Sequence, residues 1–219
     1  MSTTIHRHPD AETLMSYAAG TLAEPLSAVV AAHLSMCEGC LIETADMELI
    51  GSVLLTAPAG GLEAVRGVAV PPRPAEQRGT TVAVDAGHAA RGRLPMPIAA
   101  RYGLSFETIP WKRLAPGVLH HRLAVSPGVD GDLRLLKIAP GCTMPEHGHS
   151  GTELTLVLDG AYADETGEYR AGDVQDADAE VEHTPVTDRD HGCVCLIASE
   201  GPARFKGLIA KLMQPWTGM

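Results

Sequence analysis

Apolar residues recur at helical spacing through the first 56 residues of the chain. Pro9 is suited to the first turn of a helix, Asp10 and Glu12 favour the positive end of its dipole, and Gly20 is suited to end it. A second helix is predicted to present on one face Leu26, Val29, Val30, His33, Leu34 and Cys37. A third is predicted from about residue 41 to 55, with core contacts from Ile42, Met47, Ile50 and Leu54. The N-terminal part is therefore predicted to be all-α.

This periodicity disappears between about residues 57 and 97, where Pro71, Pro72 and Pro74 interrupt any regular element. One short helix over residues 62–70 fits within this stretch, which is otherwise predicted to be an interdomain linker. From about Ile98 onward the pattern is that of strands, with short apolar runs separated by glycine, proline and aspartate turns. The clearest runs are residues 133–138, 154–158 and 193–197. The chain is thus predicted to hold a helical domain in residues 1–85, linker included, and an all-β sandwich or barrel in residues 96–219.

Charge narrows the range of partners. The 219 residues carry a net charge of -10, which disfavours direct contact with nucleic acid or anionic lipid and favours a basic protein partner. No run of about 18 apolar residues is present, and the polar N-terminus does not resemble a signal peptide. We therefore expect a cytoplasmic protein with no membrane segment. In that compartment clustered cysteines indicate metal or redox chemistry rather than disulfides.

The clearest local motif combines His33, Cys37 and Cys40. Residues three and four apart share a helix face, so the three side chains can converge, and imidazole with two thiolates suits tetrahedral Zn²⁺. A fourth ligand has to come from elsewhere, and both His8 and His6 lie close before the first helix. A metal would also stabilise the small core that some 55 residues can form. The alternative is a core histidine beside two buried thiols.

This motif, with its upstream histidine, resembles the zinc-containing anti-sigma domain of bacterial anti-sigma factors. The sequences at residues 17–22 and 29–34 resemble the ChrR subgroup, in which the upstream ligand matches His8. Residues 1–56 hold seven acidic side chains and one basic side chain, Arg7, and such a surface can mimic the nucleic acid that a sigma factor binds. One departure is that the helix usually wedged between the sigma-factor domains would here be the short segment 62–70.

The C-terminal part resembles a cupin, a double-stranded β-helix. Two glycines, Gly141 and Gly160, frame the first cupin motif, whose ligand residues are His147, His149 and Glu153. Gly172, Asp173 and His183 resemble the second motif, although Asp178, Ala179 and Glu180 replace its usual turn, which we expect to be altered. Alternate residues of a strand face the same side, so His147 and His149 can act together. The resemblance implies a site of three histidines and Glu153.

The metal of this second site is less constrained by its ligands. Three histidines and one glutamate accommodate Zn²⁺, Fe²⁺, Mn²⁺ or Ni²⁺, and the family resemblance favours Zn²⁺. A cupin that has lost its metal is the alternative. Cys193 and Cys195 share one face of a predicted strand, either as an oxidisable pair near the cupin site or as small apolar residues of the β core.

The resemblance to ChrR-type anti-sigma factors implies a regulator and not an enzyme. The helical domain is expected to bind an extracytoplasmic-function sigma factor and keep it from RNA polymerase. The cupin is expected to sense an oxidant, singlet oxygen or a related species, and to release the sigma factor. Two alternatives stay open: a metal-dependent dioxygenase or isomerase with a helical docking domain, and a nucleic-acid or redox regulator without a sigma partner.

Overall fold

The computed structural model describes residues 4–56 and 93–205. Its helices are α1 (Ala11–Ala18), α2 (Glu24–Leu34), α3 (Glu38–Thr56) and α5 (Met96–Tyr102). Its strands are β1 (Lys112–Ala115), β2 (Val118–Arg122), β3 (Asp132–Ile138), β4 (His147–Gly148), β5 (Glu153–Asp164), β6 (Gly167–Arg170), β7 (Val174–Ala177), β8 (Glu182–His183), β9 (Val186–Thr187), β10 (Cys193–Ser199) and β11 (Arg204–Phe205). The predicted linker helix at 62–70 lies outside the described residues. None of the described helices is long and apolar enough to cross a membrane.

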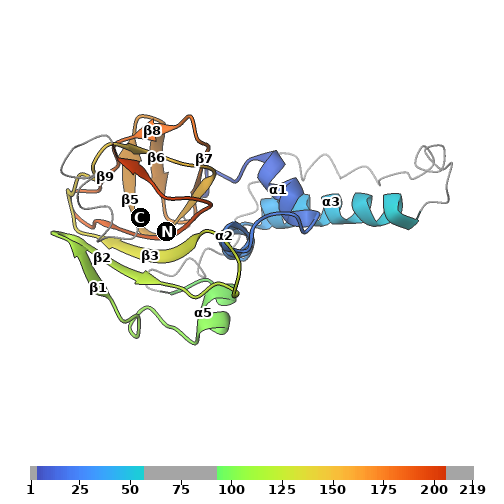
Figure 1. Cartoon of the computed structure of the whole chain (residues 1–219), viewed down its shortest axis with the longest axis horizontal. Helices are drawn as coiled ribbons and strands as arrows, with labels where there is room; N and C mark the ends of the chain where they lie inside the picture. The colour runs from blue at the N-terminus through green and yellow to red at the C-terminus, as the bar shows by residue number, and fades with distance from the viewer. Residues whose placement is uncertain (1–3, 57–92, 206–219) are drawn as a thin grey trace.

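The strands curl around a common interior (Figure 1). An eight-stranded sheet has the order β1-β2-β3-β10-β5-β6, with β7 and β9 also paired to β5, and a three-stranded sheet has the order β11-β4-β8. All of the strand pairs in these two sheets are antiparallel. This is a cupin-like β fold, and the predicted apolar runs are its β3, β5 and β10.

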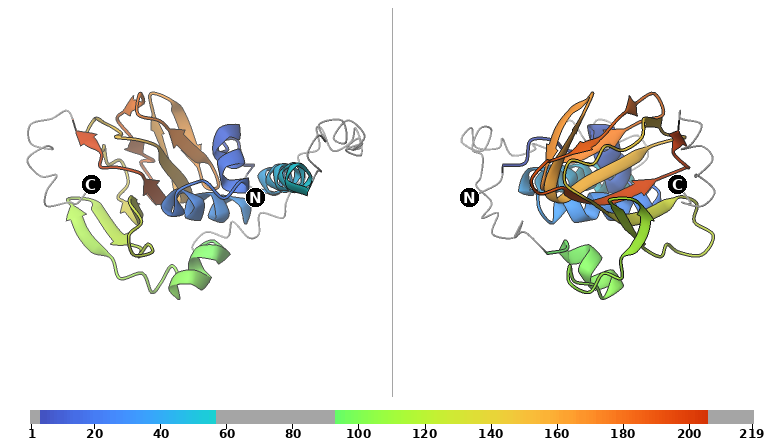
Figure 2. Two further views of the ribbon diagram at one scale, coloured as in Figure 1. Left: turned by 45° about the vertical axis from the view of Figure 1, so that its right-hand side comes forward. Right: turned by 90° about the vertical axis from the view of Figure 1, so that its left-hand side faces the viewer.

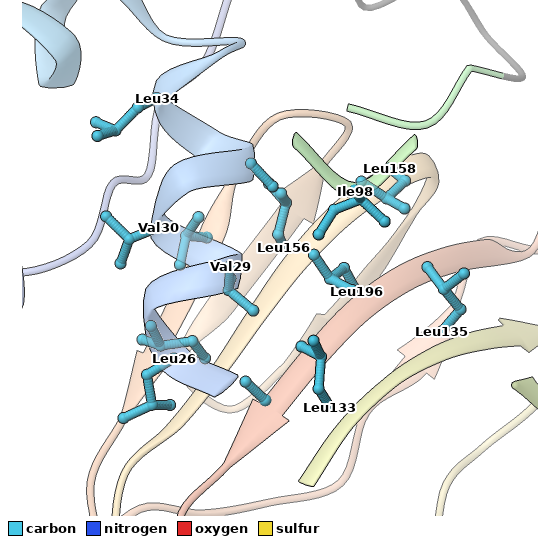
Figure 3. Packing of buried hydrophobic residues seen from close by; sticks show 14 of the residues in the cluster. Leu26, Val29, Val30, Leu34, Ile98, Leu133, Leu135, Leu156, Leu158 and Leu196 are labelled. Atoms are coloured by element: carbon cyan, nitrogen blue, oxygen red, sulfur yellow. The ribbon is translucent and has the colours of Figure 1, made fainter. Parts of the chain in front are cut away.

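Helix α2 lies against the outer face of the larger sheet, as Figures 1 and 2 show. Successive strand residues face opposite sides. The outward set forms one buried cluster with Leu26, Val29 and Val30 of α2, and comprises Leu133, Leu135, Leu154, Leu156, Val194 and Leu196 (Figure 3). The inward set faces the barrel interior and includes Arg134, Leu136, Ile138, Thr155, Cys195 and Ile197. The N-terminal helices and the sheet therefore share one core, whereas the sequence pattern predicted two separate domains.

Strand structure from about Ile98 onward was a wrong prediction for its first residues, because residues 96–102 form helix α5. Two prolines, Pro95 at the N-cap and Pro97 in the first turn, suit a helix start. Gly103 then ends the helix in the left-handed conformation, with φ +63°. Ile98 is buried in the core shared with α2. The end of the segment predicted to be a linker, at Pro95 and Pro97, is therefore the start of a helix.

Three of the four core contacts predicted for α3 are also wrong. Met47 packs against the core, but Ile42, Ile50 and Leu54 are exposed. The second half of α3 extends away from the other described helices in Figure 1. Apolar spacing identifies a helix face that burial would stabilise, but it does not show whether this chain or another protein covers that face.

Leu26→Ala is expected to lower the free energy of unfolding by about 2–5 kcal/mol, because a side chain that is 1 % exposed leaves a cavity between α2 and the sheet. Chemical denaturation followed by far-ultraviolet circular dichroism measures this change. The matched control is Leu55→Ala on α3, where the side chain is 88 % exposed and the change should stay within about 0.5 kcal/mol. Equal effects of the two substitutions would contradict the shared core.

Candidate metal centres

The first metal-binding group is assembled from three separate segments. His8 lies in the extended segment before α1, His33 in the last turn of α2, and Cys40 in the first turn of α3. Cys37 lies in the turn that joins α2 to α3, so the motif spans two helices rather than one. One ligand atom from each of the four residues lies within 4.8 Å of the others, and His6 is not part of this group.

The distances within this group fit a tetrahedral zinc site. His33 Nε2 lies 3.4 Å from Cys40 Sγ, and His8 Nδ1 lies 3.5 Å from Cys37 Sγ and 3.3 Å from Cys40 Sγ. Zinc–sulfur and zinc–nitrogen bonds in a tetrahedron imply ligand separations of about 3.5 Å. Two buried thiols with two imidazole nitrogens also form the donor set that zinc prefers.

The protonation states of the two cysteines and of His33 favour metal binding. A hydrogen bond from Cys40, supported by His33 and His8, holds the pKa of Cys37 well below its ordinary value. The Cys37 thiolate in turn raises the pKa of Cys40, so the pair retains one proton that a bound cation displaces. His33 Nδ1 lies 3.0 Å from the carbonyl oxygen of Gly172. A carbonyl only accepts, so Nδ1 carries the proton and Nε2 presents its lone pair to the thiols.

The second group lies at one end of the barrel interior. His147 on β4 pairs in register with His183 on β8, His149 follows β4, and Glu153 begins β5. One ligand atom from each of these four residues lies within 4.8 Å of the others. The Nε2 atom of His183 is 3.2 Å from that of His147 and 3.3 Å from that of His149. The residues of the two cupin motifs therefore converge in space.

Hydrogen bonds fix two of these histidines as acceptors toward the centre. His147 Nδ1 donates to the carbonyl of Pro145 at 2.8 Å, and His183 Nδ1 donates to Asp164 Oδ2 at 2.7 Å. Both rings therefore direct unprotonated Nε2 atoms inward, an arrangement that a cation satisfies. Burial lowers the pKa of His147, which keeps its ring neutral. Burial opposes ionisation of Glu153, but the neighbouring imidazoles of His149, His147 and His183 outweigh it and lower the pKa of Glu153.

The altered turn before His183 is closed by its own side chain. Asp178 Oδ1 accepts hydrogen bonds from the backbone N–H of Glu180 at 2.8 Å and of Val181 at 3.2 Å. An aspartate turn of this kind replaces the proline–glycine turn of the usual motif. His183 still reaches the site, so the departure in sequence does not remove the ligand.

A cavity of about 300 Å³ opens beside the second group. Its wall is mainly apolar, with Leu136, Met144 and Ile197, and it includes the buried Arg134, which pairs with Asp132. Cys195 lines the cavity with its Sγ atom 3.2 Å from that of Cys193. The hydrogen bond with Cys193, together with burial, raises the pKa of Cys195, so its thiol stays protonated at neutral pH.

Two residues that support the second group were not found from the sequence. Asp164 holds His183, and Gln175 on β7 donates to the same carboxylate at 2.8 Å. Asp164 is the last residue of β5, directly before the turn to β6, and its sequence context is that of any surface hairpin. Only its contacts in space with His183 on β8 and Gln175 on β7 identify its role.

Comparison with known proteins shows the family of this chain. The ChrR Cupin-like domain family matches residues 99–202. The anti-sigma-E factor ChrR of Cereibacter sphaeroides is 41% identical over 225 residues, which cover 97% of this chain and 98% of the relative. The crystal structure of Rhodobacter sphaeroides SigE in complex with the anti-sigma ChrR matches with a TM-score of 0.68 and 38% identity, covering 90% of this chain and 99% of the matched one. On this similarity along its whole length, the chain belongs to the ChrR family of anti-sigma factors.

Proposed function

We propose that this chain binds and inhibits an extracytoplasmic-function sigma factor and thereby represses transcription. Support comes from a relative that aligns along nearly its whole length and from a matched structure described as a complex of SigE with ChrR. The single observation on this chain that carries the proposal is the exposed apolar surface of α3. No other described helix or strand covers that part of α3 in Figure 1.

The surface lies on the second half of α3. Its large side chains are those of Leu49, Ile50, Leu54 and Leu55, which are 58%, 52%, 54% and 88% exposed. Contiguous exposed apolar side chains of this size mark interaction sites on soluble proteins. A helix that is apolar over most of its circumference is normally buried, and a protein partner supplies that burial.

Charge favours a basic partner at the same surface. Glu43, Asp46 and Glu48 lie on α3 among the apolar residues, and residues 1–56 carry seven acidic side chains against Arg7. Glu24 is engaged by Arg101 and by the backbone N–H of Ser126. Complementary charge steers association and opposes wrong partners.

We further infer that both metal groups bind Zn²⁺ and that the two parts divide the work. Residues 1–85 hold the sigma factor, and residues 96–219 form the cupin that senses an oxidant, singlet oxygen or a related species, and triggers release. The thiolate-rich group has the donor chemistry of a structural zinc site. The second group has three histidines, Glu153 and an adjoining cavity through which a small reactive molecule can reach it.

Co-expression of the tagged full chain with the sigma factors encoded in its genome tests this proposal. The expected result is a stoichiometric complex that carries about two zinc ions per chain. The full chain with His147→Ala should bind the sigma factor but fail to release it under singlet oxygen. Failure to capture any sigma factor would refute the proposal, and normal release by the His147→Ala chain would refute the division of work.

A further inference from the structure

The extended segment that carries His8 is docked on one turn of the barrel, between β6 and β7. Asp173 is buried in this turn, and its Oδ1 atom accepts hydrogen bonds from the backbone N–H groups of His6 at 2.7 Å and Arg7 at 3.1 Å. The backbone N–H of Val174 donates to the carbonyl of Arg7 at 3.1 Å. These three bonds fix the backbone immediately before His8, so a residue of the cupin positions a ligand of the first metal group.

The same turn orients a second ligand of that group. The carbonyl of Gly172 accepts the Nδ1 proton of His33 at 3.0 Å, and the His33 side chain is fully buried. Gly172 has φ +97°, and a Cβ atom there would lie 2.6 Å from Cγ1 of Ile5. Glycine is therefore required both for the turn and for the close approach of the N-terminal segment. Two of the four ligands of the first group depend on residues 172 and 173.

Two residues further along, the chain reaches the second metal group. Gln175 is buried on β7 and donates from Nε2 to Asp164 Oδ2 at 2.8 Å. That same oxygen accepts the Nδ1 proton of His183 at 2.7 Å. The hydroxyl of Tyr162 donates to Gln175 Oε1 at 2.8 Å, which fixes the orientation of the amide. Gln175 and His183 thus share one acceptor atom.

We propose that residues 172–175 couple the two metal groups, so that metal bound at one raises the affinity of the other. Asp173 acts as a positioning residue for the first group and Gln175 for the second. A cation bound by His183 polarises its imidazole and strengthens the bond to Asp164 Oδ2. Because Gln175 donates to the same oxygen, a change at Asp164 is transmitted to β7 and to the turn that holds His8 and His33. The inference rests on the proposed binding of metal at both groups.

The size of the effect follows from general behaviour of metal sites. Removing a hydrogen-bond partner of a ligand typically changes metal affinity about 10–100-fold. Coupling between two sites is reciprocal and typically amounts to about 5–150-fold in affinity. Loss of metal or oxidation at the cupin group would therefore weaken the first group without any direct contact between the two ions.

Cobalt titrations of the full chain test the coupling. Cobalt bound by thiolates absorbs in the near ultraviolet, and only the first group has sulfur ligands, so this band reports on that group alone. Competition with a chelator gives the affinity of the first group for cobalt, which is measured in the parent chain and in the His147→Ala variant. We expect His147→Ala to lower the affinity of the first group about fivefold or more. In the Gln175→Met background the same substitution should change it less than about twofold.

Substitutions in the turn provide the second arm. Asp173→Ala should lower the cobalt affinity of the first group about 10–100-fold. Asp173→Asn keeps Oδ1 as an acceptor for His6 and Arg7 but loses the bond that Oδ2 accepts from the backbone N–H of Arg170, so it should recover part of that affinity. The control is Asp188→Ala, because Asp188 also accepts two backbone hydrogen bonds, from Asp190 and His191, in a turn that contributes no residue to either metal group. If Asp173→Ala has no larger effect than this control, the inference is wrong.

A measurement without substitutions covers the case in which Gln175→Met does not fold. The hydrogen-bonded Nδ1 proton of His33 should shift in the NMR spectrum when the second equivalent of zinc fills the cupin group, and an unchanged resonance overturns the inference. Failure of the proposed function is distinguishable from this result. A chain without the thiolate band has no first metal site, whereas a chain with the band and equal affinities with and without His147 has two uncoupled sites.

Discussion

Ile50→Ala combined with Leu54→Ala on α3 is expected to weaken sigma-factor binding by about 100-fold or more. Buried apolar anchors at the centre of an interface each contribute about 2 kcal/mol or more when truncated, and about half of each of these side chains is exposed in the described chain. Alanine preserves the helix, so the loss reports on the contact. Surface plasmon resonance or calorimetry with the purified sigma factor measures the change in Kd.

Ser52→Ala on the same helix is the control, because this side chain is exposed and its hydroxyl bonds only to the carbonyl of Leu49. It should change Kd by less than about threefold, in keeping with surface positions in general. The unfolding midpoint of the double variant should also match that of the parent. Undiminished binding by the double variant would place the sigma-factor interface elsewhere on the chain.

His33→Ala is expected to remove one of two zinc ions and to reduce sigma-factor binding by more than about 100-fold. The imidazole is fully buried, and its loss removes a metal ligand together with the bond to Gly172. Structural zinc contributes directly to folding free energy, so α1–α3 should lose their fixed arrangement. Elemental analysis and binding assays at saturating zinc measure both effects.

His147→Ala is the matched comparison for that substitution. It also removes a histidine ligand, but from the second group, so the chain should again retain one zinc and yet bind the sigma factor nearly normally. The expected defect is instead in release under oxidant. If both histidine substitutions abolished sigma-factor binding equally, the proposed division between a part that binds the sigma factor and a part that senses the oxidant would be wrong.

Both metal groups could be predicted because their signals are local in the sequence. His33, Cys37 and Cys40 lie within eight residues, and His147, His149 and Glu153 lie within seven, so spacing alone brings most of each group together. The cupin-like β fold was also predictable, from the strand pattern and from the two motifs that resemble the cupin family. The resemblance implied His8 as a further member of the first group and His183 of the second, and the structure places both within their groups.

The remaining features depend on contacts that sequence spacing does not encode. The apolar face of α2 was predicted, but nothing local indicates that Leu196 and Leu156 cover it. Ile50 and Leu54 have the same spacing as core residues but are exposed. Apolar spacing shows which face of a helix is apolar, and it does not show whether this chain or another protein covers that face. Asp164 and Gln175 act only through the folded barrel. The predicted boundaries at residues 85 and 96 and the linker up to residue 92 stay predictions.

The hydrogen bond between His33 and Gly172 can form only after the ribosome has synthesised both residues. The two residues are 139 positions apart, so a ribosome adding roughly 5–20 residues per second completes the turn about 7–28 s after His33. Until then the histidine lacks its carbonyl partner and α2 lacks the sheet beneath it. We therefore expect the N-terminal helices to bind zinc firmly only after the whole chain has been synthesised.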